Sequence, residues 1–142
     1  MITFTLQQNL ETVVTYLLNG GGQSIRNPQS PGVGGPVCLY RGPDGAKCFV
    51  GVMIPDIDYN PNWDDPNTEA KDAYELVSEE DLTIDLMDKE EGAEALVGLQ
   101  KIHDNDNMWT ADRKKFIGWG ALKSWAKKWS LTLPENWPLQ YA

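Results

Sequence analysis

The sequence predicts a mainly helical α+β fold: a single domain over residues 1–142 with an N-terminal helix, a central β-hairpin and two longer C-terminal helices. Three observations favour this class. The 142 residues, 41% of them hydrophobic, are enough for one core and few for two. Apolar residues recur at helical spacing near both ends of the chain. Between them, a Gly-Pro-Asp-Gly sequence separates two apolar runs, as the turn of a hairpin does.

The N-terminal helix is expected over residues 5–18. Thr5, followed three residues later by Gln8, matches a capping box, in which each residue bonds the backbone N–H of the other. The apolar stripe of this helix comprises Leu6, Leu10, Val13, Val14, Leu17 and Leu18. Asn19-Gly20 is expected to end it, because glycine adopts the left-handed cap conformation without a Cβ clash.

A loop and then the hairpin are expected in the centre of the chain. Residues 19–36 hold six Gly and three Pro, a composition typical of a loop. Residues 37–41 are predicted as the first strand and residues 48–54 as the second, joined by the turn at residues 42–45. The run 48–54 is also compatible with a short buried helix ended by Pro55, because seven apolar-rich residues do not separate the two periodicities.

The two longer helices are expected over residues 88–103 and 110–130. Asp88 and Glu91 mark the start of the first, and Thr110 can cap the second. The second has an apolar stripe formed by Trp119, Leu122, Trp125, Ala126 and Trp129. A shorter helix is expected around residues 71–77.

Acidic residues are concentrated in one segment of the chain. Residues 56–94 carry fifteen acids and two lysines, whereas residues 1–55 and 95–142 each have a small positive net charge, so the overall charge is −9. This balance argues against a protein that coats nucleic acid. The acidic segment either pairs with the lysines of the C-terminal helix or presents a negative surface to a basic partner.

One stretch, from Cys38 to Asp56, reads CLYRGPDGAKCFVGVMIPD. Together with Leu-Gln-Lys-Ile-His-Asp at residues 99–104 and Leu-Thr-Leu-Pro at residues 131–134, it resembles a family of small uncharacterised proteins of phages and bacterial prophages. The chain departs from that family in its Gly/Pro-rich insertion before Cys38 and in its longer acidic segment. The resemblance implies a phage or mobile-element origin and a cytoplasmic setting, and it implies no activity.

The residues that could carry chemistry are few. Cys48, His103 and Asp104 are the candidate catalytic residues, since a nucleophilic thiol needs a base and a group that orients the base. Cys38, Cys48 and His103 are the candidate metal ligands, although the nine-residue spacing of the cysteines is not that of a zinc hook. The alternative is that both cysteines are buried structural thiols and that His103 caps the end of its helix.

Other side chains are candidates for binding. Five of the six tryptophans lie between residues 109 and 137 among basic residues, which is typical either of a binding surface or of an aromatic core. We take Trp109, Trp119 and Trp125 as candidate binding residues of this region. The remaining candidates are Arg41, which could hold an anion, and Asp64 and Asp65 of the acidic segment.

These observations favour a small non-catalytic phage or prophage accessory protein that binds and modulates a host protein in the bacterial cytoplasm, counter-defence being one form of such modulation. The alternatives are a nucleic-acid mimic that uses the acidic segment, and a small Cys/His hydrolase or metal-binding protein. Enzymatic activity is left open, with the balance against it. No cofactor, no membrane association and no nucleic-acid partner are expected, and the oligomeric state is not predicted.

Overall fold

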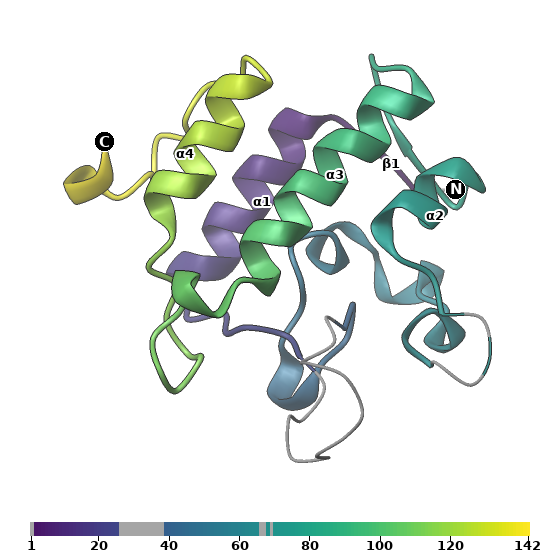
Figure 1. Ribbon diagram of the computed structural model, residues 1–142, viewed down its shortest axis with the longest axis horizontal. Helices are drawn as coiled ribbons and strands as arrows, with labels where there is room; N and C mark the ends of the chain where they lie inside the picture. Colours follow the sequence, from purple (N-terminus) through teal and green to yellow (C-terminus); the bar gives the residue numbers. More distant parts are fainter. Residues whose placement is uncertain (1, 26–38, 66–67, 69) are drawn as a thin grey trace.

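A computed structural model describes residues 2–25, 39–65, 68 and 70–142. Four α-helices and two strands are present in these residues: β1 (Ile2–Phe4), α1 (Leu6–Leu18), α2 (Ala73–Ser78), β2 (Leu82–Ile84), α3 (Lys89–Asp104) and α4 (Trp119–Lys128). Short 3-10 turns connect them (Figure 1). The mainly helical α+β class predicted from the sequence is therefore confirmed. No helix in the described residues is both long and apolar enough to cross a membrane.

The helices begin where the sequence places their caps. The Thr5 side chain accepts from the Gln8 N–H and the Gln8 side chain accepts from the Thr5 N–H, which completes the predicted capping box of α1. Gly20 has a φ of 85° directly after this helix. Asp88 caps α3 by accepting from the Glu91 N–H at 2.8 Å.

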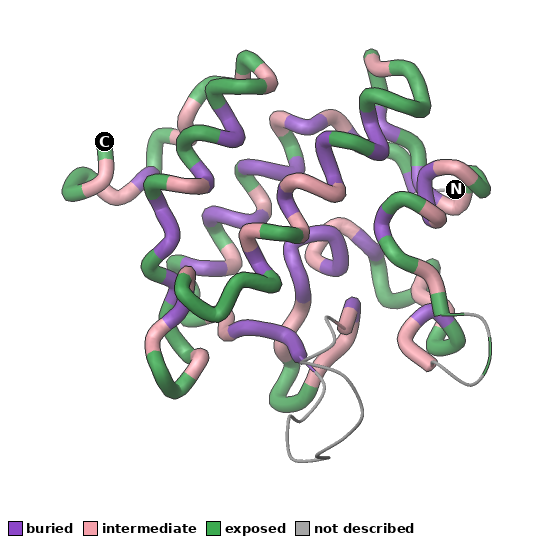
Figure 2. The backbone as a smooth tube through the Cα atoms, in the orientation of Figure 1, coloured by how far each residue is buried: buried purple, intermediate pink, exposed green. Residues whose placement is uncertain are grey.

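The core lies between the three longest helices. The buried residues run along the inner faces of α1, α3 and α4, whereas the loops and tips are exposed (Figure 2). Two buried side-chain hydrogen bonds lie in this core: Asn9 joins α1 to the loop at the Phe49 carbonyl, and the Trp125 indole joins α4 to α3 at the Ala95 carbonyl. The strands β1 and β2 pair in parallel, with Ile2 opposite Leu82 and Phe4 opposite Ile84.

The predicted central hairpin is wrong. Residues 39–54 form no strand: residues 43–45 are a 3-10 turn, and a second such turn, Gly51–Met53, lies within the expected return strand. Cys48, Phe49 and Val50 are all fully buried, whereas a half-buried strand would turn alternate side chains outward. The short-helix alternative for residues 48–54 is closer to what is found. Residues 37 and 38, and most of the expected loop 19–36, lie outside the described residues.

The last helix is also shorter than predicted. It begins at Trp119 rather than near Thr110, because residues 109–118 form a turn closed by an antiparallel bridge between Trp109 and Phe116. The Thr110 hydroxyl donates to the Asp112 side chain instead of capping a helix. Arg113, at a φ of 62°, reverses the chain there.

Candidate functional site

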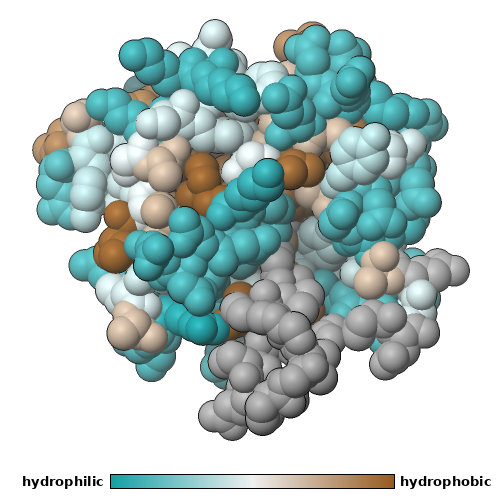
Figure 3. Space-filling model, viewed as in Figure 1, coloured by the Kyte–Doolittle hydropathy of each residue, from teal (hydrophilic) through white to brown (hydrophobic). Residues whose placement is uncertain are grey.

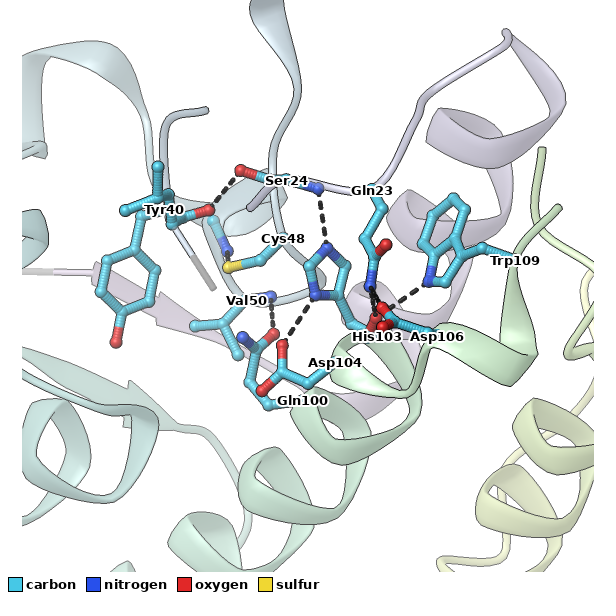
Figure 4. A network of polar contacts seen from close by, with 12 residues as sticks. Gln23, Ser24, Tyr40, Cys48, Val50, Gln100, His103, Asp104, Asp106 and Trp109 are labelled. Carbon is cyan, nitrogen blue, oxygen red and sulfur yellow. Dashed lines mark hydrogen bonds and ion pairs between the residues drawn. The ribbon is translucent and has the colours of Figure 1, made fainter. Parts of the chain in front are cut away.

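His103, at the C-terminal end of α3, is the centre of a buried polar network (Figure 4). Its Nε2 accepts from the backbone N–H of Ser24 at 3.1 Å, so the ring hydrogen is on Nδ1, which donates to Asp104 Oδ1 at 2.9 Å. Its backbone carbonyl accepts from Gln23 Nε2 at 2.9 Å and from the Trp109 indole at 2.8 Å. His103 therefore joins α3 to the segment that follows α1.

This geometry limits the chemistry available to the candidate catalytic residues. The structure brings His103 and Asp104 together, but both ring nitrogens of His103 are engaged. Cys48 lies in the same region with no solvent exposure, and its sulfur accepts from the Gly51 N–H at 3.2 Å (Figure 4). A general base must be able to reach the proton that it removes, and His103 holds no free nitrogen for the thiol. The arrangement fits a structural role for the three residues.

The candidate metal ligands are only partly described. Cys38 lies outside the described residues, so the structure gives no distance between its sulfur and that of Cys48. Within the described ranges, no group of three or more His, Cys, Asp or Glu side chains is arranged to hold a metal ion. The zinc hypothesis stays a prediction.

Arg41 is used inside the protein. Its guanidinium donates to the carbonyls of Tyr40, Gly51 and Ile54 and pairs with Asp56 at 3.0 Å. It also lies 4.8 Å from the centre of the Tyr59 ring. These contacts hold residues 40–59 in an irregular path, and they explain why the expected hairpin does not form: the carbonyls that a second strand would need are bonded by a side chain.

Asp64 belongs to the same network of polar contacts as Arg41. Its carboxylate accepts from the N–H groups of Tyr40 at 2.8 Å and Arg41 at 3.1 Å, and from the Tyr59 hydroxyl. Burial of the Tyr59 ring, followed by the hydrogen bond to Asp64, raises the pKa of Tyr59. Asp65, the next residue, is half-buried at the end of the 3-10 turn Pro61–Asp64. Two of the candidate binding residues, Arg41 and Asp64, thus meet in one structural network.

Tyr59→Phe is expected to lower the free energy of unfolding at pH 7 by about 1.5–3 kcal/mol, the usual range for a lost hydrogen bond to a charged group. Because the folded protein holds the Tyr59 proton more tightly than the unfolded chain, this stabilisation is complete below pH about 10 and is lost as the pH rises further. Urea denaturation from pH 7 to 11 measures both effects. Tyr74→Phe, which removes a hydroxyl from an exposed side chain, is the control. Parallel profiles for wild type and Tyr59→Phe would contradict the expectation.

The tryptophans chosen as candidate binding residues are buried. Trp109, Trp119 and Trp125 are 3%, 5% and 6% exposed. Their rings belong to a series of edge-to-face contacts that runs from Phe49 and His103 through Trp109 and Phe116 to Trp119 and Trp137. This placement agrees with the aromatic-core alternative, and the three rings present no binding surface in this conformation.

The acidic segment receives little charge from the C-terminal end. Among the described residues, the basic side chains of residues 95–142 form one ion pair with it, Lys128–Glu94 at 3.5 Å. Lys71 pairs with Glu79 and Asp81, and Lys89 with Glu80, within the segment itself. In the described part of the segment, ten acids are exposed: residues 56, 58, 72, 79, 80, 85, 88, 90, 91 and 94. Of the two sequence alternatives, the geometry favours a negative surface turned outward.

Comparison with family models, with curated proteins and with solved structures finds no match. The fold and the contacts above are therefore the basis for a functional proposal. Sequence reasoning missed Gln23, Ser24 and Arg113, because no local pattern indicates that a Gly-rich segment will lie against residues 103–114. The consecutive glycines at 20–22 were the one available signal that the backbone there approaches other groups closely.

Proposed function

We propose that this protein is a small non-catalytic accessory protein of a phage or prophage. It acts in the cytoplasm of the bacterial host, where it binds and modulates a host protein through a negative surface. The observation that carries the proposal is the exposed acidic segment, in which six of the ten exposed acids form no ion pair among the described residues. A surface of this kind steers a basic partner during association and disfavours acidic ones.

The acids gather at one end of the molecule, which we call the acidic end: the turn 79–81, the loop 85–88 and the first turn of α3. In Figure 1 this end lies with α2 and β1, away from α4 and the C-terminus, and Figure 3 shows mostly hydrophilic atoms over it. The acids come from separate elements that fold together, so they form one surface. A partner would meet them at the same time.

Two exposed apolar side chains accompany these charges. Leu86 is 89% exposed at a φ of 69°, and Tyr74 of α2 is 56% exposed. A leucine in the left-handed region costs roughly 1 kcal/mol, and such strained positions are frequent at functional sites. An apolar centre with a polar rim is the usual composition of a protein interface. This supports a protein partner over a purely electrostatic contact.

The polar groups that could act in catalysis are already bonded within the protein, which also favours a binding function. Both nitrogens of His103 and the sulfur of Cys48 are bonded within the fold, and Arg41 is bonded to four groups of its own chain. The acidic end is different, since most of its side chains face solvent. The geometry of the acidic end therefore favours binding of a partner over catalysis.

The double variant Glu90→Gln, Glu91→Gln tests the proposal, because both side chains are exposed in the first turn of α3. It should cost less than about 1 kcal/mol in stability and abolish capture of the partner. Tagged wild type and variants are incubated with bacterial lysate, and the retained proteins are quantified by mass spectrometry. The control Glu11→Gln, Glu135→Gln makes the same change of net charge elsewhere. We expect basic proteins that wild type and control retain and the acidic-end variant loses.

Equal retention by all three proteins, or no specific retention, would overturn the proposal. The nucleic-acid mimic is separated from it by adding duplex DNA to the lysate. A target that is released by DNA uses its DNA-binding surface to hold the acidic end, whereas a target that stays bound uses another surface.

A further inference from the structure

A cavity of about 600 Å³ lies among three loop segments: residues 20–23 after α1, residues 43–46, and residues 112–114 before α4. Its volume is within the range of small-molecule sites, 300–1,000 Å³. It is separate from the acidic end and has no part in the function proposed above. Its wall contains two polar groups with unused hydrogen-bonding capacity, and these identify the ligand chemistry.

The first group is the guanidinium of Arg113. Among the described residues, the one polar contact of this guanidinium is an ion pair of Nη2 with Asp106 at 3.6 Å, and Nη1 is buried without a hydrogen-bond partner. Arg41 offers the comparison, since its guanidinium donates to three carbonyls and one carboxylate. A guanidinium presents five N–H donors, and burying one unused costs free energy. Arg113 therefore has donors available for an anion.

The second group is the side-chain oxygen of Gln23, a residue only 7% exposed. Gln23 Nε2 donates to the His103 carbonyl at 2.9 Å and to Asp106 Oδ1 at 3.4 Å, which fixes the orientation of the amide (Figure 4). The opposite atom, Oε1, is buried and has no partner among the described residues. The wall thus combines an unused donor with an unused acceptor.

We propose that this cavity binds a small phosphate-bearing ligand. Arg113 donates to the phosphate oxygens, as guanidinium groups do in bidentate geometry. Gln23 Oε1 accepts from a protonated phosphate oxygen or from a hydroxyl of the ligand. The Arg113 side chain is 29% exposed and tethered by one long ion pair, so it can turn its donors towards the bound phosphate.

The other charges of the cavity wall indicate how much negative charge the ligand carries. Lys114 adds a positive charge, whereas Asp44 and Asp112 add negative ones, so the lining is neutral overall. The Asp112 carboxylate accepts from the Thr110 hydroxyl and the Lys114 N–H, which lower its pKa and keep it charged. A neutral lining with one available guanidinium suits a single phosphate group and disfavours a polyanion.

The test is an NMR titration of the ¹⁵N-labelled full chain with inorganic phosphate and, separately, with sulfate, at constant ionic strength near pH 6.8. Amide signals of residues 20–23, 44–46 and 112–114 should shift with phosphate. Sulfate should bind several-fold more weakly, because phosphate carries a proton for Gln23 Oε1 at this pH and sulfate does not. Arg113→Asn should weaken phosphate binding at least about tenfold, the effect of one lost charge-assisted interaction.

Two further variants keep the result interpretable. Asn adopts positive φ readily, so Arg113→Asn should keep the fold, and Arg113→Lys, which retains the charge without the fork, should give an intermediate loss. Lys123→Gln removes an exposed positive charge from α4 and should leave binding within about twofold, as expected for a distant surface charge. Absence of localised shifts, equal losses in Arg113→Asn and Lys123→Gln, or equal binding of phosphate and sulfate would overturn the proposal.

Discussion

Replacing His103 with alanine is expected to lower the free energy of unfolding by about 3–5 kcal/mol, the range for truncating a large buried ring. The side chain has no solvent exposure and contacts the rings of Phe49 and Trp109 edge to face. Its removal opens a cavity and also takes the acceptor from the Ser24 N–H. A buried N–H without a partner adds about 1–3 kcal/mol.

Two further substitutions at this position separate volume from hydrogen bonding. His103→Leu keeps most of the volume and loses the acceptor for Ser24, whereas His103→Gln keeps an oxygen near the position of Nε2. We expect stability in the order wild type, Gln, Leu, Ala, measured by urea denaturation followed by tryptophan fluorescence. Hydrogen exchange of the Ser24 amide should accelerate most in the Leu and Ala variants.

Asp104→Asn is the matched control for this series. The Asp104 side chain is 45% exposed and contacts the other ring nitrogen of His103, so its loss should cost less than about 1 kcal/mol. If Asp104→Asn were as damaging as His103→Leu, the hydrogen bond to Asp104 rather than the Ser24 contact would be the important bond of His103. If His103→Ala were mild, the network would not hold the segment after α1 in place.

The parts of the fold that were predictable are those with local causes. A capping box acts over four residues, and a helical apolar stripe over a few turns, so α1 and α3 could be placed from the sequence to within about a residue. The stripe of Trp119, Leu122 and Trp125 likewise indicated a core face, and all three residues are buried. The burial of Trp109 has no such local signal, because it depends on the bridge to Phe116.

The parts that were not predictable depend on contacts between distant residues. The turn at residues 42–45 has the composition of a hairpin turn, but Arg41 and Asp64 bond the backbone groups that would form the ladder. Asp64 is 23 residues from Arg41 in the chain. The same reason applies to the candidate site: the Ser24 N–H meets His103 across 79 positions, and no spacing rule covers such a pair.

Gly51→Ala is expected to be the most damaging small substitution in the Arg41 network. A Cβ at Gly51 would lie 2.5 Å from the Tyr40 carbonyl oxygen and 3.0 Å from its Cα, and backbone atoms cannot turn aside as a flexible side chain can. The carbonyls of both residues are acceptors of the Arg41 guanidinium. Moving either segment therefore weakens several bonds together, and we expect a loss of about 3 kcal/mol, the upper part of the range for overpacking.

Gly120→Ala is the natural control, because a Cβ at this exposed position of α4 has nothing within 4 Å. Alanine in a helix is favoured over glycine by up to about 1 kcal/mol, so this variant should be as stable as wild type or slightly more so. Paired urea denaturation curves measure the difference between the two glycines. A small loss in Gly51→Ala would mean that residues 40 and 51 separate easily. Their close approach would then not be what fixes Arg41 in the centre of the network.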